Sequence, residues 1–220
     1  MFGFIDIAGG GTFFKYYDQG GPVMNVLLLF SILGLIFIIE RFWVLQRARI
    51  KTEVFLDKIR NTLLKKQNIQ EAIKVCEQNK RSPIANILKA GLLKHGHAED
   101  EIEKSIQIAV TYELARLERG LPVIATVANV APLTGFLGTV TGMIKSFDEL
   151  ARAGLNNPGA VAAGISEALI TTATGLIIAI PTLMCYNWFT AKISRFILEM
   201  ETGSNILLET FVEMESKSKA

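Results

Sequence analysis

Apolar residues along the chain gather in three long stretches that contain no charged side chain: Pro22–Ile39, Gly120–Ile144 and Ala168–Ala191. A helix needs about 20 mostly apolar residues to cross the roughly 30 Å of bilayer hydrocarbon. Each stretch is therefore long enough to span a membrane, the first only just. A cleaved signal peptide is the alternative for the first stretch, but no basic cluster precedes it and no small-residue cleavage site follows it.

The region between the first two stretches has the periodicity of short amphipathic helices. Apolar residues recur at helical spacing in Val54–Leu64, Ile69–Cys76 and Ile84–Leu93. Ser82-Pro83 opens the third of these helices, because proline in a first turn sacrifices no hydrogen bond.

Two of the spans are expected to extend beyond the membrane as long helices. From Glu99 a helical pattern runs toward the second stretch, which predicts one long helix that continues into it, bent near Pro122 and Pro132. The third stretch is expected to extend likewise through Phe196 to Phe211. The predicted fold is an all-α membrane protein with three transmembrane helices, of which the second and third enter a helical cytoplasmic region.

Composition supports a membrane protein with an aqueous part. The chain is 50% hydrophobic and 20% charged, with a mean hydropathy of +0.35. Its charge is concentrated, since Glu40–Arg119 holds 16 of the 23 basic and 11 of the 21 acidic residues. This distribution excludes a uniform soluble globule, and the apolar content excludes disorder. No basic stripe with interleaved aromatics suggests nucleic acid. Cys76 and Cys185 fall in different zones, so no disulfide is expected.

Basic residues near the ends of the spans predict the orientation in the membrane. Only Lys15 precedes the first span, whereas basic residues closely follow the first and third spans: Arg41, Arg47, Arg49, Lys51, Lys192 and Arg195. In the link between the second and third spans, Lys145 and Arg152 are balanced by Asp148 and Glu149. The expected order is a short periplasmic N-terminus (1–19), the first span (20–40), a cytoplasmic helical region (41–119), the second span (120–145), a short periplasmic loop (146–163), the third span (164–191) and a cytoplasmic C-terminal helix (192–220).

Glu167 is the candidate for chemistry at the entrance of the third span. A carboxylate deep in a membrane costs about 2.5–3.5 kcal/mol on insertion scales, so such a residue usually faces a cavity or a partner. Thr171 and Thr174 follow at +4 and +7 and share its helix face. The alternative is an interfacial glutamate in contact with water.

The second span carries a narrow face of small residues. It runs from Pro132 through Gly135 and Thr139 to Gly142, with Gly138 beside it. Such a face is equally typical of close helix packing alone, and a membrane threonine often bonds only its own helix. The pattern by itself leaves a pore lining and simple packing both open.

Enzymatic and metal chemistry have little support in the sequence. No nucleophile and base are placed together. His95 and His97 stand two residues apart, which puts them on different sides of a helix. No metal site, no cofactor and no enzymatic activity are therefore expected.

Two longer motifs resemble a known family. Ala131–Ile144 (APLTGFLGTVTGMI), followed by Ser146-Phe147, and Ile165–Leu176 (ISEALITTATGL), continuing through Ala179-Ile180-Pro181 to Tyr186-Asn187, are similar to signatures of the MotA/TolQ/ExbB proton-channel family. The resemblance covers Leu121–Asn187. Three spans in this order are similar to the ExbB and TolQ branches, whereas the MotA branch has four.

The resemblance implies a bacterial inner-membrane protein that assembles as a homo-pentamer around a central pore. The pore holds the single-span helices of an ExbD/TolR-like dimer, whose membrane aspartate carries the proton. The family's pore threonines match Thr139 and Thr172, and its pore glutamate matches Glu167. Helical periodicity instead places Thr171 on the face of Glu167, so Thr171 is a further candidate. The helix-packing or kink positions are Pro132, Gly135, Gly138, Gly142, Gly175 and Pro181.

The function expected from the resemblance is that of an ExbB-like stator subunit. It would couple proton flow to TonB-dependent transport across the outer membrane. The alternatives are a TolQ-like subunit that acts with a TolA-like protein in envelope maintenance, or a non-conducting membrane scaffold. A membrane-embedded enzyme would need a convergent set of His, Asp, Cys or Ser that the spans lack.

Overall fold

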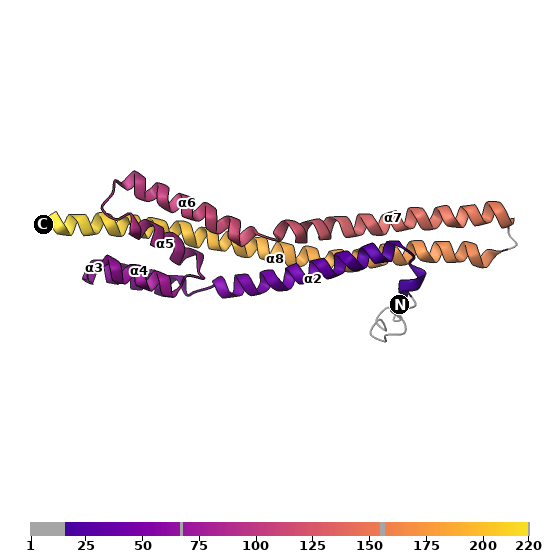
Figure 1. Ribbon diagram of the computed structural model, residues 1–220, viewed down its shortest axis with the longest axis horizontal. Helices are drawn as coiled ribbons and strands as arrows, with labels where there is room; N and C mark the ends of the chain where they lie inside the picture. The colour runs from indigo at the N-terminus through magenta and orange to yellow at the C-terminus, as the bar shows by residue number, and fades with distance from the viewer. Residues whose placement is uncertain (1–15, 67, 155–156, 220) are drawn as a thin grey trace. The chain divides into compact units, whose positions relative to one another are not determined.

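The computed structural model describes residues 16–66, 68–154 and 157–219, and these residues form helices without a β-strand (Figure 1). The predicted N-terminal segment therefore lies largely outside the described residues. The predicted all-α fold is confirmed. In chain order the helices are α2 (Val23–Ala48), α3 (Thr52–Lys66), α4 (Ile69–Gln78), α5 (Pro83–Leu93), α6 (Glu99–Glu118), α7 (Leu121–Ala153) and α8 (Pro158–Lys219).

The helices belong to two compact units. The first unit comprises Met1–Ile39 and Gly120–Asn187, and the second comprises Glu40–Arg119 and Trp188–Ala220. Three helices are long and apolar enough to cross a membrane, and the three predicted spans lie within them, apart from residues 20–22.

In the first unit, α2 packs on α7 and α8 through one face only. Met24 and Leu27 are buried together with Ala131. Further along α2, a Cβ atom added at Gly34 would lie 3.2 Å from Cγ1 of Val127, so this glycine allows close approach. Elsewhere α2 exposes large apolar side chains, and Leu35 is 59% exposed. This exposure is what a helix that faces lipid requires.

The second unit has a core of large apolar side chains. The helices predicted within residues 54–93 are confirmed as α3, α4 and α5, and the C-terminal part of α8 packs with them. Among the buried core residues are Phe55, Leu56, Ile59, Leu63, Ile87, Leu88, Leu92, Ile106, Met200, Leu207 and Phe211. The predicted extension of the third span is therefore confirmed, since its apolar residues complete this core.

Local signals explain where the short helices of the second unit begin and end. The Asn68 side chain caps α4 by accepting a hydrogen bond from the Glu71 amide at 3.0 Å. Pro83 occupies the first turn of α5, as predicted. After α5 the chain turns at Gly96, whose φ of 86° favours glycine.

The predicted continuous helix from Glu99 into the second span is wrong in one respect, because the chain leaves helical geometry between α6 and α7. Gly120 has a left-handed φ of 87°, and Pro122 stands in the first turn of α7. The Arg41 guanidinium donates to the last carbonyls of α6, at 3.3 Å to Arg116 and 3.4 Å to Leu117. The apolar pattern continues across the break because both helices have a packed face, which hid the interruption.

The helices α7 and α8 reach beyond the apolar stretches that predicted them. α7 continues to Ala153 and α8 begins at Pro158, so most of the connection expected at residues 146–163 is helical. α8 has 62 residues, about three times the length that crosses the hydrocarbon. Pro132 and Pro181 lie inside α7 and α8.

Candidate functional site

The helices α7 and α8 meet along a line of small residues, which we call the α7–α8 seam. On α7 it comprises Gly135, Gly138 and Gly142. A Cβ atom at Gly135 would lie 2.8 Å from the Thr171 carbonyl oxygen, and one at Gly142 would lie 2.7 Å from the Gly164 carbonyl oxygen. Backbone therefore meets backbone, the packing that small residues allow in membranes.

The remaining predicted packing or kink positions are Gly175, Pro132 and Pro181. A Cβ atom at Gly175 would lie 2.7 Å from the carbonyl oxygen of Ala131, which places this glycine in the seam. Pro132 is half-buried, whereas Pro181 is exposed. Both prolines lie inside their helices, Pro132 in α7 and Pro181 in α8.

Thr171 is buried inside the seam. Its side chain is 0% exposed, and its hydroxyl donates to carbonyls of its own helix, at 2.9 Å to Ala168 and 3.1 Å to Glu167. A Cβ atom at Gly138 would overlap the Thr171 side chain. Thr171 therefore lies between α7 and α8 in this helix pair, because the face that it shares with Glu167 turns toward α7.

The side chains of Thr172 and Thr139 both donate hydrogen bonds to the same turn of α7. The Thr172 hydroxyl crosses the seam and donates to the Gly135 carbonyl at 3.0 Å. In an α-helix that carbonyl also accepts the amide of Thr139, four residues on. The Thr139 hydroxyl donates to the Phe136 carbonyl at 2.6 Å. Both side chains are half-buried, and each oxygen keeps lone pairs that can accept a hydrogen bond.

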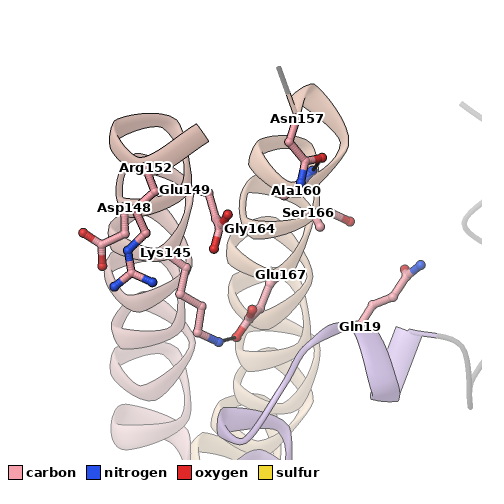
Figure 2. Close-up of a pocket in the computed structure, with 11 residues that line it drawn as sticks. Gln19, Lys145, Asp148, Glu149, Arg152, Asn157, Ala160, Gly164, Ser166 and Glu167 are labelled. Atoms are coloured by element: carbon pink, nitrogen blue, oxygen red, sulfur yellow. Dashed lines mark hydrogen bonds and ion pairs between the residues drawn. The ribbon is translucent and has the colours of Figure 1, made fainter. Parts of the chain in front are cut away.

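Glu167 lies where all three apolar helices converge. Its Oε1 pairs with Nζ of Lys145 on α7 at 2.5 Å, with side-chain exposures of 14% for Glu167 and 54% for Lys145. Figure 2 shows Lys145 reaching across from its helix to this carboxylate. A Cβ atom at Gly21, just before α2, would overlap the carboxylate, and the φ of 64° at Gly21 also favours glycine.

A polar pocket of about 710 Å³ opens beside this ion pair (Figure 2). Two basic and three acidic side chains line it, together with polar and small residues: Gln19, Lys145, Asp148, Glu149, Arg152, Asn157, Ala160, Ala163, Gly164, Ser166 and Glu167. The excess of carboxylates over basic groups favours cations over anions in this pocket.

Sequence reasoning missed Lys145 and Ser146 as parts of the site. The Ser146 hydroxyl is buried and bonds the Gly142 carbonyl at 3.2 Å and the Val161 carbonyl at 3.0 Å, which ties α7 to α8. Lys145 entered the sequence-based prediction only in the charge count of the link, whereas the structure pairs its ammonium with Glu167. Spacing could have identified Lys145 as part of the site. It follows Gly138 by seven residues and Gly142 by three, so it shares their helix face.

Outside the apolar stretches, burial shifts two titratable groups. Burial raises the pKa of Glu113, although Arg116 and a hydrogen bond from Asn86 act against it. Burial also raises the pKa of the Cys76 thiol to about 12. No group of His, Cys, Asp and Glu among the described residues has the arrangement of a metal site. His95 instead packs edge-on against Phe211, with ring centroids 5.0 Å apart.

Comparisons with known proteins identify the family of the chain. The MotA/TolQ/ExbB proton channel family matches residues 79–202. A Synechocystis sp. protein named biopolymer transport protein ExbB-like 3 is 33% identical over 190 residues, 84% of this chain and 89% of that protein. The biopolymer transport protein ExbB of Xanthomonas campestris is 30% identical over 70% of this chain and 68% of its own length. The Tol-Pal system protein TolQ of Pseudomonas aeruginosa is 42% identical over 41% of this chain and 39% of its own length.

The family match extends over more than half of the chain and includes all of α7 and the part of α8 that forms the seam. The resemblance predicted from the two motifs is confirmed. Members of the family are proton-channel subunits of transport systems and not enzymes. This chain, a multi-pass membrane protein with three helices able to span the bilayer, belongs to the MotA/TolQ/ExbB proton channel family.

Proposed function

We propose that the chain is an ExbB-like stator subunit of a motor driven by the proton-motive force. Five copies form a ring in the bacterial inner membrane around the single-span helices of an ExbD/TolR-like dimer. The ring couples inward proton flow to TonB-dependent transport across the outer membrane. The N-terminus is periplasmic and the C-terminus cytoplasmic, because basic residues follow the first and third spans.

The observation that carries this proposal is the pairing of Thr139 and Thr172 on one turn of α7. Among the described threonines of the apolar stretches with an identified hydroxyl bond, only Thr172 donates across the seam, while the others bond their own helix. Because both hydroxyl protons are engaged, the two oxygens are left as acceptors. A protonated carboxyl on a neighbouring helix supplies the donor that they lack.

The partner's membrane aspartate is that donor in the proposed mechanism. Each proton that moves inward gains about 2.3 kcal/mol per 100 mV of membrane potential. We call the paired hydroxyls of Thr139 and Thr172 the threonine niche. Protonation neutralises the aspartate, which lowers the free-energy cost of moving it from this niche to an apolar surface. Five niches around two partner helices cannot all be satisfied at once, so successive protonations advance the partner helices in the ring.

The Glu167 pocket serves as the entrance in this proposal. Its excess of carboxylates attracts protons to the outer end of the seam. Large apolar side chains on the outer faces of α7 and α8, including Phe136, Val140, Leu169 and Leu176, are exposed in the single chain. Such surfaces suit lipid or neighbouring helices, as ring assembly requires.

The test replaces each niche threonine by valine, which keeps the shape and removes the hydroxyl. Thr139→Val and Thr172→Val should abolish energised transport while the chain still co-purifies with its single-span partner. Thr182→Val is the matched control, because Thr182 is buried near Gly34 of α2 and its hydroxyl bonds only the Ile178 carbonyl. Full activity of both niche variants would refute the proposal. A non-conducting scaffold predicts in addition that Glu167→Gln is tolerated and that nothing depends on the proton gradient.

A TolQ-like role in envelope maintenance is the second candidate. It is favoured by the 42% identity to the TolQ protein over 91 residues, higher than the identity to either ExbB relative above. The ExbB role is favoured because those alignments extend over 70% and 84% of this chain. Identification of the protein that co-purifies with the chain and its partner separates the two, since a TonB-like rod indicates transport and a TolA-like rod indicates envelope maintenance.

A further inference from the structure

A small basic pocket lies in the second unit, at the end of α2 and along α8. Its volume is about 110 Å³, and it is lined by Arg49, Ile50, Lys192, Arg195, Phe196 and Glu199. It belongs to neither the α7–α8 seam nor the polar pocket beside Glu167.

The basic groups of this pocket lack acidic partners. Glu199 is the one carboxylate among the lining residues, and it already accepts a hydrogen bond from the Thr52 hydroxyl at 2.7 Å. In the described part of the chain, no ion pair involves Arg49, Lys192 or Arg195. Three positive charges therefore face one negative charge, which leaves the pocket cationic.

Two exposed tryptophans lie on the helices that lead to the pocket, and one of them, Trp188, contacts the lining residue Lys192. Trp43 is 58% exposed and Trp188 is 45% exposed. The Trp188 ring stacks on Phe42 with centroids 6.0 Å apart, and the Lys192 ammonium lies 5.9 Å from the Trp188 ring centroid. Exposed tryptophans at the ends of apolar helices are typical of the membrane–water interface.

The order along α8 places the basic groups at the depth of lipid headgroups. Lys192 and Arg195 follow Trp188 by four and seven residues, which is one and two helical turns. The uncharged stretch Ala168–Ala191 ends immediately before Lys192. On α2, Trp43 likewise precedes Arg49 by six residues.

We propose that this pocket binds the phosphate of an anionic phospholipid. Its volume suits a phosphate group and not acyl chains, which pass along the exposed aromatic rings. Basic pockets next to membrane helices bind anionic headgroups in this way, and anionic lipids are common in the cytoplasmic leaflet. The site does not depend on the proton pathway proposed above, and its binding test needs neither the partner nor a proton gradient.

The two tryptophans give a direct measurement, because the chain contains only Trp43 and Trp188. The full chain is reconstituted in mixtures of phosphatidylcholine and phosphatidylglycerol, with one or the other lipid brominated, and the quenching of tryptophan fluorescence gives the relative affinity for the anionic lipid. Wild type should prefer phosphatidylglycerol. In the variant Arg49→Gln/Lys192→Gln/Arg195→Gln, the relative affinity for phosphatidylglycerol should fall at least roughly fivefold.

A matched control removes the same charge elsewhere. Lys58→Gln/Lys74→Gln/Lys104→Gln changes three exposed lysines of the second unit and should keep the wild-type preference. Glu199→Gln removes the competing carboxylate and should strengthen the preference. Circular dichroism of each variant checks that the helices are retained.

Three results would overturn the proposal. Equal loss in the control variant would mean that only total charge matters. Equal quenching by the two brominated lipids in wild type would mean that no anionic site exists. Displacement of phosphatidylglycerol by excess inorganic phosphate would assign the pocket to a soluble anion and not to a lipid.

Discussion

The two compact units of the chain hold their helices together in different ways. The second unit packs large side chains around Leu63, Ile87 and Leu88, which are 0–1% exposed. The seam of the first unit consists of glycine, alanine and threonine, and a Cβ atom added at Gly135, Gly142 or Gly175 would meet backbone of the facing helix. Large apolar side chains in that unit point mainly outward, as Leu133 and Phe136 do.

The difference follows from the solvent around each unit. In water, burial of apolar area drives helices together at about 25 cal/mol per Å², so large side chains belong inside. In lipid that driving force is absent, and association depends on close packing and on hydrogen bonds between helices. Close packing also brings hydroxyls and carbonyls to the helix surfaces, so the seam that holds α7 and α8 together supplies the polar groups of the candidate proton pathway.

The largest expected effect comes from truncation in the core of the second unit. Leu88→Ala should lower the free energy of unfolding by about 2–5 kcal/mol, because it leaves a cavity. The same change at Leu35 on α2, where the side chain is 59% exposed, should cost far less. Chemical denaturation in detergent, followed by circular dichroism, measures both. Equal losses would contradict the contrast between the two units.

A methyl group added to the seam tests the backbone contacts. Gly135→Ala should lose about 1–3 kcal/mol through overpacking, because the Thr171 carbonyl cannot move aside. Gly91→Ala in α5 is the control, since the nearest atoms to its added Cβ are side-chain atoms of Leu207 and Ile106, at 2.7 and 2.9 Å, and not backbone. Both changes replace a helical glycine by a better helix former. In the same denaturation assay, Gly135→Ala should have a lower free energy of unfolding than Gly91→Ala. The reverse order would argue against tight backbone packing.

A smaller effect is expected from the buried carboxylate of Glu113. Because burial raises its pKa, the folded chain binds this proton more tightly than the unfolded chain does. Stability should therefore fall as pH rises from the ordinary value of 4.5 through the raised pKa. Glu113→Gln should stabilise the chain near neutral pH, with no gain below the ordinary pKa, because the amide oxygen can still accept from Asn86.

Glu77, in the same unit, should give the opposite dependence of stability on pH. The hydrogen bond from Lys89 lowers the pKa of Glu77, so its contribution is present above the ordinary pKa and is lost as pH falls. Glu77→Gln should therefore lower stability near neutral pH, slightly, because the pair is exposed. Melting temperatures of both variants across pH 3–8 test the two signs, and a parallel change in the two would contradict the assignment of burial as the cause at Glu113.

The smallest expected effect on stability is at the ion pair between Lys145 and Glu167. Since Lys145 is 54% exposed, a double-mutant cycle with Lys145→Gln and Glu167→Gln should give a coupling energy of about 0–1 kcal/mol. If Glu167 acts in the proton pathway, Glu167→Gln should impair transport even so. A coupling of several kcal/mol, with transport retained, would make the pair a structural element of the first unit.

Much of the fold could be predicted because its signals are local. Uncharged stretches mark the apolar helices, and residues such as Asn68 and Pro83 mark helix starts in the second unit. The break at Gly120 was missed because apolar periodicity continues on both sides of it. A left-handed glycine is set by how the two helices must pack, which a local pattern does not record.

The candidate site was less predictable because it depends on contacts between distant residues. The motifs identified Thr139, Thr172 and Glu167, but periodicity favoured Thr171 over Thr172. Periodicity shows which residues share a face but not which face turns toward α7. The pairing of Lys145 with Glu167 joins residues 22 positions apart, and only the packed helix pair reveals it.

Proton influx into liposomes tests the central claim most directly, that Thr139 and Thr172 form part of a proton pathway. The chain and its single-span partner are reconstituted, a membrane potential is imposed, and an internal pH indicator records the influx. Thr172→Val should reduce influx to the level of empty liposomes, while Thr182→Val conducts like wild type. Influx through Thr172→Val equal to that of wild type, in complexes of the same composition, would contradict the account.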